Sequence, residues 1–307
     1  MLYDLIIIGG GPAGVAAGVY AARKKIRVLL VTDIFGGQSL TSAEIQNWIG
    51  EKSISGLDLG NKLESHLKSQ EGIEIMEESL VSKVFEAGDF LEVEIEGGDK
   101  LKTKTLLVTV GSRYKRLGIP GEDRFEGKGV AFCSTCDAPI FKSKDVAVVG
   151  GGNSGLEAVH DLLPYAKSIT LIHRGESLKG DPLTQERVLS DKKVSTILNA
   201  ETKEIVGGDT VTGLKYLDKK SGDVKTLEVQ GVFVKIGQVP NTDFLGSLVN
   251  KDKFGQVIID HKTQASSRVG IWAAGDATDV LYKQNNISAG DAVKAVLNIY
   301  DYLKSSN

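Results

Sequence analysis

Two segments of the chain share one pattern, in which an apolar run leads into closely spaced glycines and then into an alanine-containing stretch of helical character. The first covers residues 5–14 (Leu-Ile-Ile-Ile-Gly-Gly-Gly-Pro-Ala-Gly) and the second covers residues 146–155 (Val-Ala-Val-Val-Gly-Gly-Gly-Asn-Ser-Gly). Neither apolar run alternates with polar positions, which is typical of parallel strands buried on both faces. A second apolar strand follows each segment, at residues 27–31 and 168–172. The pattern predicts two Rossmann-like strand–helix–strand units.

Alternating apolar and polar positions mark shorter strands in residues 73–95 and 194–229, where glycine-containing turns interrupt them. This alternation predicts a small antiparallel meander, and therefore a second sheet, attached to each unit. Further strands end in glycine within residues 106–111, 231–237 and 271–276.

The length of 307 residues exceeds what one hydrophobic core usually supports, so two domains are expected. We place the crossings between them near residues 114–118 and 240–243. The predicted fold class is α/β, with two Rossmann-like three-layer nucleotide-binding domains, the second inserted into the first. The first domain is predicted to comprise residues 1–115 and 243–307, and the second residues 116–242.

Charge and hydropathy exclude several classes of partner. The net charge of -3 comes from 37 basic and 40 acidic residues spread along the chain, without a basic run that could follow a nucleic-acid backbone. No apolar stretch approaches the roughly 20 residues that span a bilayer, and no basic segment precedes the first apolar run. We therefore expect no nucleic-acid or membrane partner and a cytoplasmic protein, in which a disulfide is more often catalytic than structural.

Each glycine segment contains the spacing G-x-G-x-x-G. In a dinucleotide site the glycines allow a tight turn and let backbone N–H groups approach a pyrophosphate at the start of the helix. An isolated match also occurs in plain turns, but two matches, each after a strand and before a helix, favour nucleotide binding. The candidate contacts are Gly9, Gly11 and Gly14 in the first segment and Gly150, Gly152 and Gly155 in the second.

The end of the second strand distinguishes nicotinamide cofactors, because an acidic residue there bonds a ribose hydroxyl whereas basic residues accept a 2′-phosphate. The second unit has His173 and Arg174 at this position and Lys179 shortly after, which favours NADPH over NADH. The alternative is a solvated charged strand end. In the first unit Asp33 either contacts a ribose or begins a loop.

Both cysteines of the chain, Cys133 and Cys136, form one C-x-x-C sequence. Such a pair is half of a zinc site, a structural staple or a redox dithiol. Zinc is disfavoured because the four histidines are scattered singly, so no metal is expected. A staple that closes so short a loop would stabilise little, so redox exchange is favoured. Asp137 either carries a proton for the sulfurs or acts as a helix cap.

The order of these motifs closely resembles the low-molecular-weight thioredoxin reductases over nearly the whole chain. The chain is also similar to the reductase portion of the flavoprotein of alkyl hydroperoxide reductase. The motifs behind the first resemblance are residues 9–14, Gly36-Gly37-Gln38, Asn47-Trp48, residues 133–137, residues 150–155, Gly275-Asp276 and Tyr282-Lys283-Gln284.

The resemblance implies that FAD binds to the first unit and a nicotinamide cofactor to the second. The implied FAD contacts are Gly9, Gly11, Pro12, Ala13, Gly14, Asp33, Gly37, Gln38, Asn47, Gly111, Gly275, Asp276, Lys283 and Gln284. The implied nicotinamide contacts are Gly150, Gly152, Asn153, Ser154, Gly155, His173, Arg174 and Lys179.

The resemblance also implies an activity, a partner and an assembly. Hydride passes from NADPH to FAD, which then reduces the Cys133–Cys136 disulfide. Cys136 faces the flavin, Cys133 attacks the disulfide of thioredoxin or a thioredoxin-like protein, and Asp137 is the acid. A homodimer is implied as well. Where NADPH-dependent members have His-Arg-Arg, this chain has His173-Arg174-Gly175. NADH or another electron donor, a peroxide-reducing system, and a redox sensor without turnover therefore stay open as alternatives.

Overall fold

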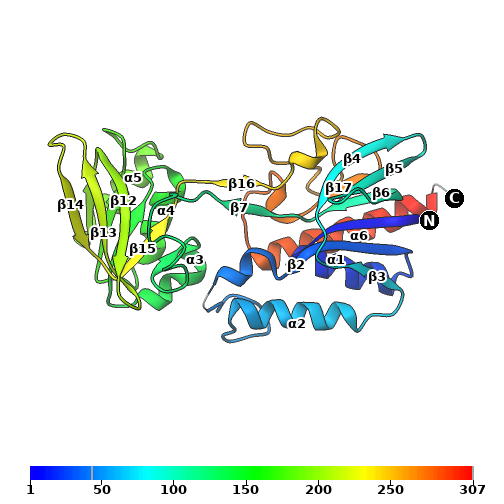
Figure 1. Ribbon diagram of the computed structural model, residues 1–307, viewed down its shortest axis with the longest axis horizontal. Helices are drawn as coiled ribbons and strands as arrows, with labels where there is room; N and C mark the ends of the chain where they lie inside the picture. The colour runs from blue at the N-terminus through cyan, green and yellow to red at the C-terminus, as the bar shows by residue number, and fades with distance from the viewer. Residues whose placement is uncertain (43, 306–307) are drawn as a thin grey trace. The chain divides into compact units, whose positions relative to one another are not determined.

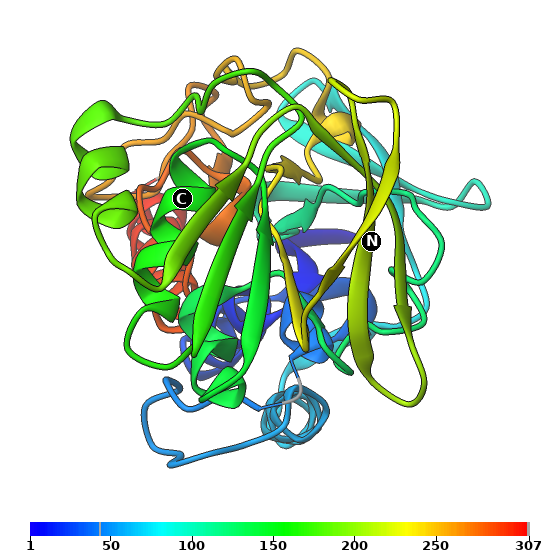
Figure 2. The same ribbon diagram turned by 90° about the vertical axis from the view of Figure 1, so that its left-hand side faces the viewer.

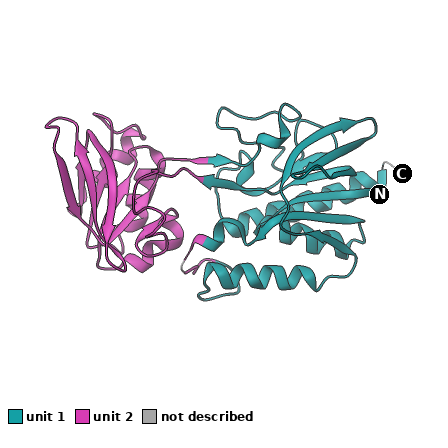
Figure 3. Ribbon diagram, viewed as in Figure 1, with its two compact units in different colours: residues 1–40, 48–113, 239–307 teal, residues 41–47, 114–238 magenta. Residues whose placement is uncertain are grey.

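The chain divides into two compact units in the computed structural model, which describes residues 1–42 and 44–305. Unit 1 comprises residues 1–40, 48–113 and those from 239 onward, and unit 2 comprises residues 41–47 and 114–238 (Figure 3). The chain crosses between the units after residues 113 and 238. The grouping of residues 41–47 with unit 2 has no counterpart in the sequence pattern.

The main sheet of unit 1 is built on five parallel strands (Figure 1). They are β1 (Leu2–Gly10), β2 (Val28–Phe35), β3 (Ile73–Met76), β6 (Lys100–Val108) and β17 (Ile271–Ala273). In the parallel part the order is β3-β2-β1-β6, and β17 also pairs with β6. The apolar run of β1 is buried because it lies between β2 and β6, with Leu5 opposite both Val28 and Thr105.

Helices cover one face of this sheet. They are α1 (Pro12–Arg23), α2 (Gly56–Lys68) and α6 (Asn285–Ser305). Side chains of α1 and α6 form one hydrophobic core with Leu5, Ile7 and Leu107. The alternate residues Ile6, Ile8 and Leu106 enter a second core on the opposite face. The central strands are therefore buried on both faces, as their unbroken apolar runs predicted.

The antiparallel strands of unit 1 correct one expectation. β4 (Val81–Ala87) and β5 (Phe90–Ile95) form a hairpin that extends the main sheet by pairing with β6, so no second sheet is made. The preceding strand β3 pairs parallel with β2, with Ile73 opposite Val28, and is not part of a meander. Its alternating pattern arises because it is the edge strand and is only partly buried.

Unit 2 has a five-stranded parallel sheet in the order β11-β10-β9-β15-β8. These strands are β8 (Val130–Ala131), β9 (Asp145–Val149), β10 (Ser168–Ile172), β11 (Val194–Ile197) and β15 (Gly231–Val234). β11 was expected in a meander, but it is the parallel edge strand beside β10. The helices of this unit are α3 (Ser134–Asp137), α4 (Asn153–Leu162) and α5 (Pro182–Leu189).

A separate antiparallel sheet of unit 2 matches the expected meander, and Figure 2 gives a view of its strands. It consists of β12 (Ala200–Gly207), β13 (Val211–Asp218) and β14 (Val224–Glu228). The two connections between the units pair as short strands, β7 (Ser112–Tyr114) and β16 (Gln238–Pro240). Short 3-10 turns lie at Gly37–Thr41, Ala138–Phe141, Asp243–Leu245 and Gly275–Ala277. Among the described residues, no helix combines the length and apolar character needed to cross a bilayer.

Candidate functional site

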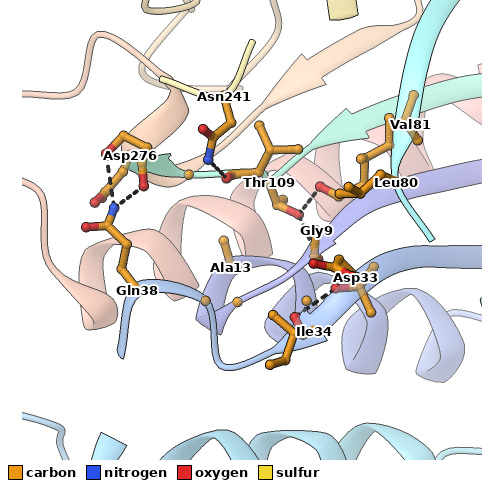
Figure 4. A pocket seen from close by; sticks show the side chains of 18 of the residues that line it. Gly9, Ala13, Asp33, Ile34, Gln38, Leu80, Val81, Thr109, Asn241 and Asp276 are labelled. Carbon is orange, nitrogen blue, oxygen red and sulfur yellow. Dashed lines mark hydrogen bonds between the residues drawn. The ribbon is translucent and has the colours of Figure 1, made fainter. Parts of the chain in front are cut away.

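Unit 1 contains a cavity of about 800 Å³ at the carboxyl ends of β1, β2 and β6 (Figure 4). Ligands of open parallel sheets bind at this edge, and the volume is within the range of ligand pockets. Nine of the expected FAD contacts line it: Gly9, Gly11, Pro12, Ala13, Asp33, Gly37, Gln38, Gly111 and Asp276. The other expected contacts, Gly14, Asn47, Gly275, Lys283 and Gln284, are not among its lining residues.

The three glycines of the first fingerprint have different environments. Gly9 has φ +115° and lies so close to Thr109 that an added Cβ would be 2.6 Å from its carbonyl oxygen. A Cβ on Gly14 would overlap the Gly9 carbonyl, so the third glycine lets α1 pack against β1. A Cβ on Gly11 would have no heavy atom nearer than the Gly37 Cα at 4.0 Å. Gly11 is therefore open toward the cavity, where a pyrophosphate would lie.

The start of α1 is also suited to an anion. Gly11 is its N-cap residue and provides no side-chain cap, and the first turn carries no acidic residue. Pro12 occupies the first turn, where its missing N–H costs nothing. The remaining N–H groups and the positive end of the helix dipole can thus serve a phosphate.

Two ends of the cavity can be distinguished in Figure 4. Asp33 and Ile34 lie at one end with Leu80 and Val81, and Gln38 and Asp276 lie at the other. The exposed Asp33 directly follows the buried part of β2, where an acidic residue can contact a ribose.

Several lining residues were not anticipated from the sequence. They are Ile34, Ser39, Leu80, Val81, Ser82, Glu96, Asn241, Asp243, Phe244, Asn285 and Ser288. They lie outside the fingerprint in the sequence, so no short-range sequence pattern indicates that they line the cavity. The Ser39 hydroxyl is buried and has no hydrogen-bond partner among the described residues, which is consistent with a polar ligand in the cavity.

Hydrogen bonds organise the Gln38 and Asp276 end. The Gln38 amide donates to the Ser112 carbonyl and, at 3.1 Å, to its hydroxyl. Burial raises the pKa of Asp276, and Ser288 donates a 3.3 Å bond to its Oδ1. The Lys283 ammonium donates to the Thr278 and Asp276 carbonyls. Lys283 therefore holds the turn that carries Asp276 and does not line the cavity.

The second fingerprint, in unit 2, repeats the arrangement of the first. Gly150 has φ +132°, and a Cβ on Gly155 would overlap the Gly150 carbonyl. Around Gly152 a Cβ would meet no heavy atom within 4 Å. Gly152 begins α4 without a side-chain cap, and no acidic residue lies in the first turn. Unit 2 thus presents a second open site for a pyrophosphate.

The basic residues after β10 differ in their surroundings. His173 Nδ1 accepts a 3.2 Å hydrogen bond from the Gly151 N–H. Burial lowers the pKa of His173, and the charges of Lys179 and Arg174 lower it further, so the imidazole is neutral at pH 7. Arg174 and Lys179 are exposed, and no ion pair to either is found among the described residues. The positive charge expected here therefore comes from Arg174 and Lys179.

The remaining two expected contacts lie at the start of α4. The Asn153 side-chain oxygen accepts a 2.7 Å bond from the Asp181 N–H, which ties the loop after β10 to the fingerprint. Ser154 is exposed in the first turn of the helix.

Cys133 and Cys136 form a disulfide at the start of α3, in unit 2. The Cys136 N–H donates a 3.2 Å bond to Cys133 Sγ. Asp137 follows directly and is 7% exposed. Burial raises the pKa of Asp137 to about 7, against smaller lowering effects of the Cys133 N–H and the Lys235 charge. A carboxyl with this pKa exchanges protons readily at neutral pH.

Two residues beside the dithiol were also not anticipated from the sequence. Asp161 accepts hydrogen bonds from the hydroxyls of Ser134, at 2.8 Å, and Thr135, at 3.2 Å. Lys235 donates a 3.0 Å bond to the carbonyl before Cys133. Lys235 directly follows the buried apolar strand β15, which is an unusual position for a lysine and a signal that the sequence contains, whereas no sequence pattern marks Asp161. Within the described part of the chain, no group of three or more His, Cys, Asp or Glu is arranged to hold a metal.

Two Rossmann-like units, each with an open glycine fingerprint, together with a disulfide beside a buried acid, define a nucleotide-dependent disulfide oxidoreductase. The chain belongs to the pyridine nucleotide-disulphide oxidoreductase family, whose model matches residues 3–294. Membership implies a flavoprotein that uses FAD and a pyridine nucleotide.

Named relatives and solved structures agree with this membership. The chain is 43% identical to a protein named NADH dehydrogenase from Bacillus subtilis, over 98% of this chain and 58% of the relative. It is 41% identical to the F subunit of alkyl hydroperoxide reductase in Escherichia coli, again over 98% of this chain and 58% of the relative. It therefore spans less than two thirds of these relatives.

The structure of thioredoxin reductase from Streptococcus pyogenes matches with a TM-score of 0.92 and 34% identity, over 99% of both chains. The thioredoxin reductase from Giardia duodenalis matches with the same TM-score and 28% identity, over 99% of both chains. These findings confirm the fold class and both resemblances expected from the sequence motifs.

Proposed function

We propose that this protein is a thioredoxin-disulfide reductase, which passes electrons from NADPH through FAD and the Cys133–Cys136 dithiol to thioredoxin or a thioredoxin-like protein. The observation that carries this proposal is the disulfide followed by a buried acid, within the unit that holds the second fingerprint. FAD would bind in the cavity of unit 1, with its pyrophosphate at Gly11 and Pro12. The resemblance also supports a homodimer.

The chemistry of the dithiol follows from its residues. When bound in the cavity of unit 1, FAD would supply the two electrons, drawn from the nicotinamide nucleotide, that reduce the Cys133–Cys136 disulfide to a thiolate and a thiol. The Cys133 thiolate then attacks the partner disulfide, a mixed disulfide forms, and one partner sulfur leaves as a thiolate. Cys136 attacks Cys133 Sγ, which restores the enzyme disulfide and releases the second partner sulfur. Asp137, with a pKa of about 7, gives a leaving thiolate its proton.

Arg174 and Lys179 support NADPH as the preferred donor. Both are exposed in the loop that follows β10, where a 2′-phosphate would lie. One observation favours a second candidate. Two relatives with 41 to 43% identity are named as an NADH dehydrogenase and as the F subunit of alkyl hydroperoxide reductase, which supports an NADH-dependent reductase that feeds a peroxide-reducing system.

Stopped-flow spectroscopy of the FAD-loaded protein with NADPH and NADH tests this function. We expect NADPH to bleach the visible flavin absorption and thioredoxin to restore it, and we expect Cys136→Ser to abolish the restoration. In the double variant Arg174→Ala/Lys179→Ala the KM for NADPH should rise about tenfold or more, with little change for NADH, because charge-assisted bonds to phosphate are lost. Faster bleaching by NADH would favour the second candidate. No bleaching with either nucleotide would contradict both and leave a redox sensor.

A further inference from the structure

Lys235 connects the second fingerprint to the dithiol. Its N–H donates a 2.8 Å bond to the Val149 carbonyl, and its own carbonyl packs against Gly150, the first glycine of the fingerprint. Its side chain extends toward the dithiol, where the ammonium donates a 3.0 Å hydrogen bond to the Phe132 carbonyl. That carbonyl belongs to the peptide bond that precedes Cys133.

The charged groups around this ammonium flank the C-x-x-C sequence on both sides. Asp137, directly after Cys136, interacts electrostatically with Lys235, and so do Glu157 and Asp161 of α4. Asp161 in turn holds the two residues between the cysteines through their hydroxyls. Lys128 and Lys144 line a cavity of about 250 Å³ that also includes Asp137, but the charge that acts on the Asp137 carboxyl is that of Lys235.

The carboxyl groups around the dithiol make formation of a cysteine thiolate electrostatically unfavourable. Asp137 adjoins Cys136, and Asp161 binds the two residues between the cysteines, so a negative charge on either carboxyl group would disfavour the thiolate that exchange requires. A partly buried cation is screened less by solvent than a surface cation, so its effect on nearby ionisation is larger. Burial itself lowers the pKa of Lys235, while Asp161, Glu157 and Asp137 raise it. Lys235 and Asp137 thus favour each other's charged forms.

We propose that Lys235 is a positioning residue for the dithiol, whose ammonium holds the peptide bond before Cys133 and stabilises the thiolate of the reduced Cys133–Cys136 pair. It acts on the sulfurs through charge and does not exchange with the partner. Because the reduced form is stabilised, the disulfide is more readily reduced than it would be without this cation. This inference rests on the proposed function, since it gives the reductase a residue that tunes its redox pair.

The test uses the FAD-loaded protein and its variants Lys235→Met, Lys235→Gln and Lys235→Arg. Each is equilibrated with dithiothreitol buffers near pH 8, and thiols are counted by alkylation and mass spectrometry. The count is unambiguous because Cys133 and Cys136 are the only cysteines of the chain. We expect the ratio of reduced to oxidised protein to fall about tenfold in the Met and Gln variants, which corresponds to about 30 mV for a two-electron couple. Arg should keep the wild-type value.

A second measurement follows the rate of alkylation of the reduced protein by iodoacetamide against pH. The midpoint should rise by about one pH unit in the Met and Gln variants and stay in place in the Arg variant. Repeating the series with Asp137→Asn in the background separates the thiolate from the Asp137 carboxyl, whose pKa also rises when Lys235 is lost. In the Asp137→Asn background, the midpoint pH should still differ by about one unit between the protein with Lys235 and the Lys235→Met variant.

Lys193→Met is the matched control, because Lys193 also donates to a backbone carbonyl, that of Leu163 at 2.9 Å, but is exposed and does not neighbour the dithiol. It should match the wild type in both measurements. Equal values for Lys235→Met and the wild type would overturn the proposal. Wild-type values in Lys235→Gln would also overturn it, because the hydrogen bond and not the charge would then be responsible. Neither measurement uses a nicotinamide or thioredoxin, so a failure of the proposed function is seen separately.

Discussion

Asp137 illustrates how burial changes what one residue can do. Its carboxyl is 7% exposed and its Oδ1 has no hydrogen-bond partner among the described residues. Loss of hydration disfavours the charged form, which is the largest cause of the pKa of about 7. Lys235 and the Cys133 N–H act in the opposite direction but do not cancel it. The side chain is therefore able to hold and release a proton near neutral pH.

The raised pKa has a consequence for stability. The folded protein keeps the Asp137 proton from about pH 4 to about pH 7, where the unfolded chain, with an ordinary pKa of 3.8, has released it. This contribution to stability is fully present below pH 3.8 and is lost as the pH rises through about 7. Relative to the wild type, Asp137→Asn should therefore gain on the order of 3 kcal/mol between pH 4.5 and pH 8.

Urea unfolding of the oxidised proteins at both pH values checks this expectation. Asp145→Asn is the control. Hydrogen bonds from Ser168 and Lys167 lower the pKa of Asp145, so its stabilisation is lost only at more acidic pH. The difference between this control and the wild type should stay constant over the same range. A constant difference for Asp137→Asn as well would contradict the assigned pKa.

At the scale of elements, the glycines of the two strand–turn–helix segments have the same environments in unit 1 and unit 2. The first glycine allows close approach of the segment after a neighbouring strand, and the third lets the helix start lie against its own strand, because side chains there would collide with backbone carbonyls. The middle glycine touches little protein and leaves the N–H groups of the helix start accessible. The first and third glycines are thus required by the fold, whereas the middle glycine is the one that we propose to contact the ligand.

This division predicts opposite outcomes for neighbouring alanine variants. Gly14→Ala should destabilise unit 1 by several kcal/mol, because its Cβ would overlap the Gly9 carbonyl. Gly11→Ala should fold normally, since its φ of -73° suits any residue and its surroundings are open, but it should weaken FAD binding at least tenfold. Thermal unfolding and flavin fluorescence titration distinguish the two. Normal FAD affinity in Gly11→Ala would contradict the assigned ligand position.

Gly152→Ala offers the same comparison in unit 2. It should keep FAD and the fold but bind the nicotinamide at least tenfold more weakly, because the methyl group would enter the open space at the start of α4. Isothermal titration calorimetry with NADPH measures this. Unchanged affinity would place the nucleotide elsewhere.

At the scale of the whole molecule, the chain builds separate cores. Two hydrophobic clusters belong to unit 1, one on each face of its main sheet. Two others belong to unit 2, one toward α4 and one against the antiparallel sheet. Residues 114–238 form one continuous segment that contains both cores of unit 2. A segment with its own core meets the requirement for folding alone.

We therefore expect the segment 114–238, expressed by itself, to fold with the Cys133–Cys136 disulfide. It should bind NADPH within about threefold of the intact protein and should not bind FAD, because the second fingerprint and its basic residues are all present. Circular dichroism, urea unfolding and calorimetry check these expectations. An unfolded segment would contradict the expectation that residues 114–238 fold alone.

Local sequence determined the parts of this protein that depend on near neighbours. The buried strands, the two fingerprints and the dithiol were all predictable, because a strand, a tight turn and a helix start each require particular residues at fixed spacing. The placement of β3 and β11 was not. Four-residue strands that alternate look the same in a meander and at the edge of a parallel sheet, and only pairing with β2 and β10 separates the two.

Tertiary structure alone decided the surroundings of the chemical groups. Lys235 reaches the Phe132 carbonyl across 103 positions of sequence, and Asp161 reaches Ser134 across 27. His173 is a basic residue by sequence, yet burial against Gly151 makes it a neutral hydrogen-bond acceptor. Such properties depend on which distant segments exclude water from a side chain, and no periodicity in the sequence records that. The sequence by itself therefore determined which candidate reactive groups the protein has, and the fold decided their charge.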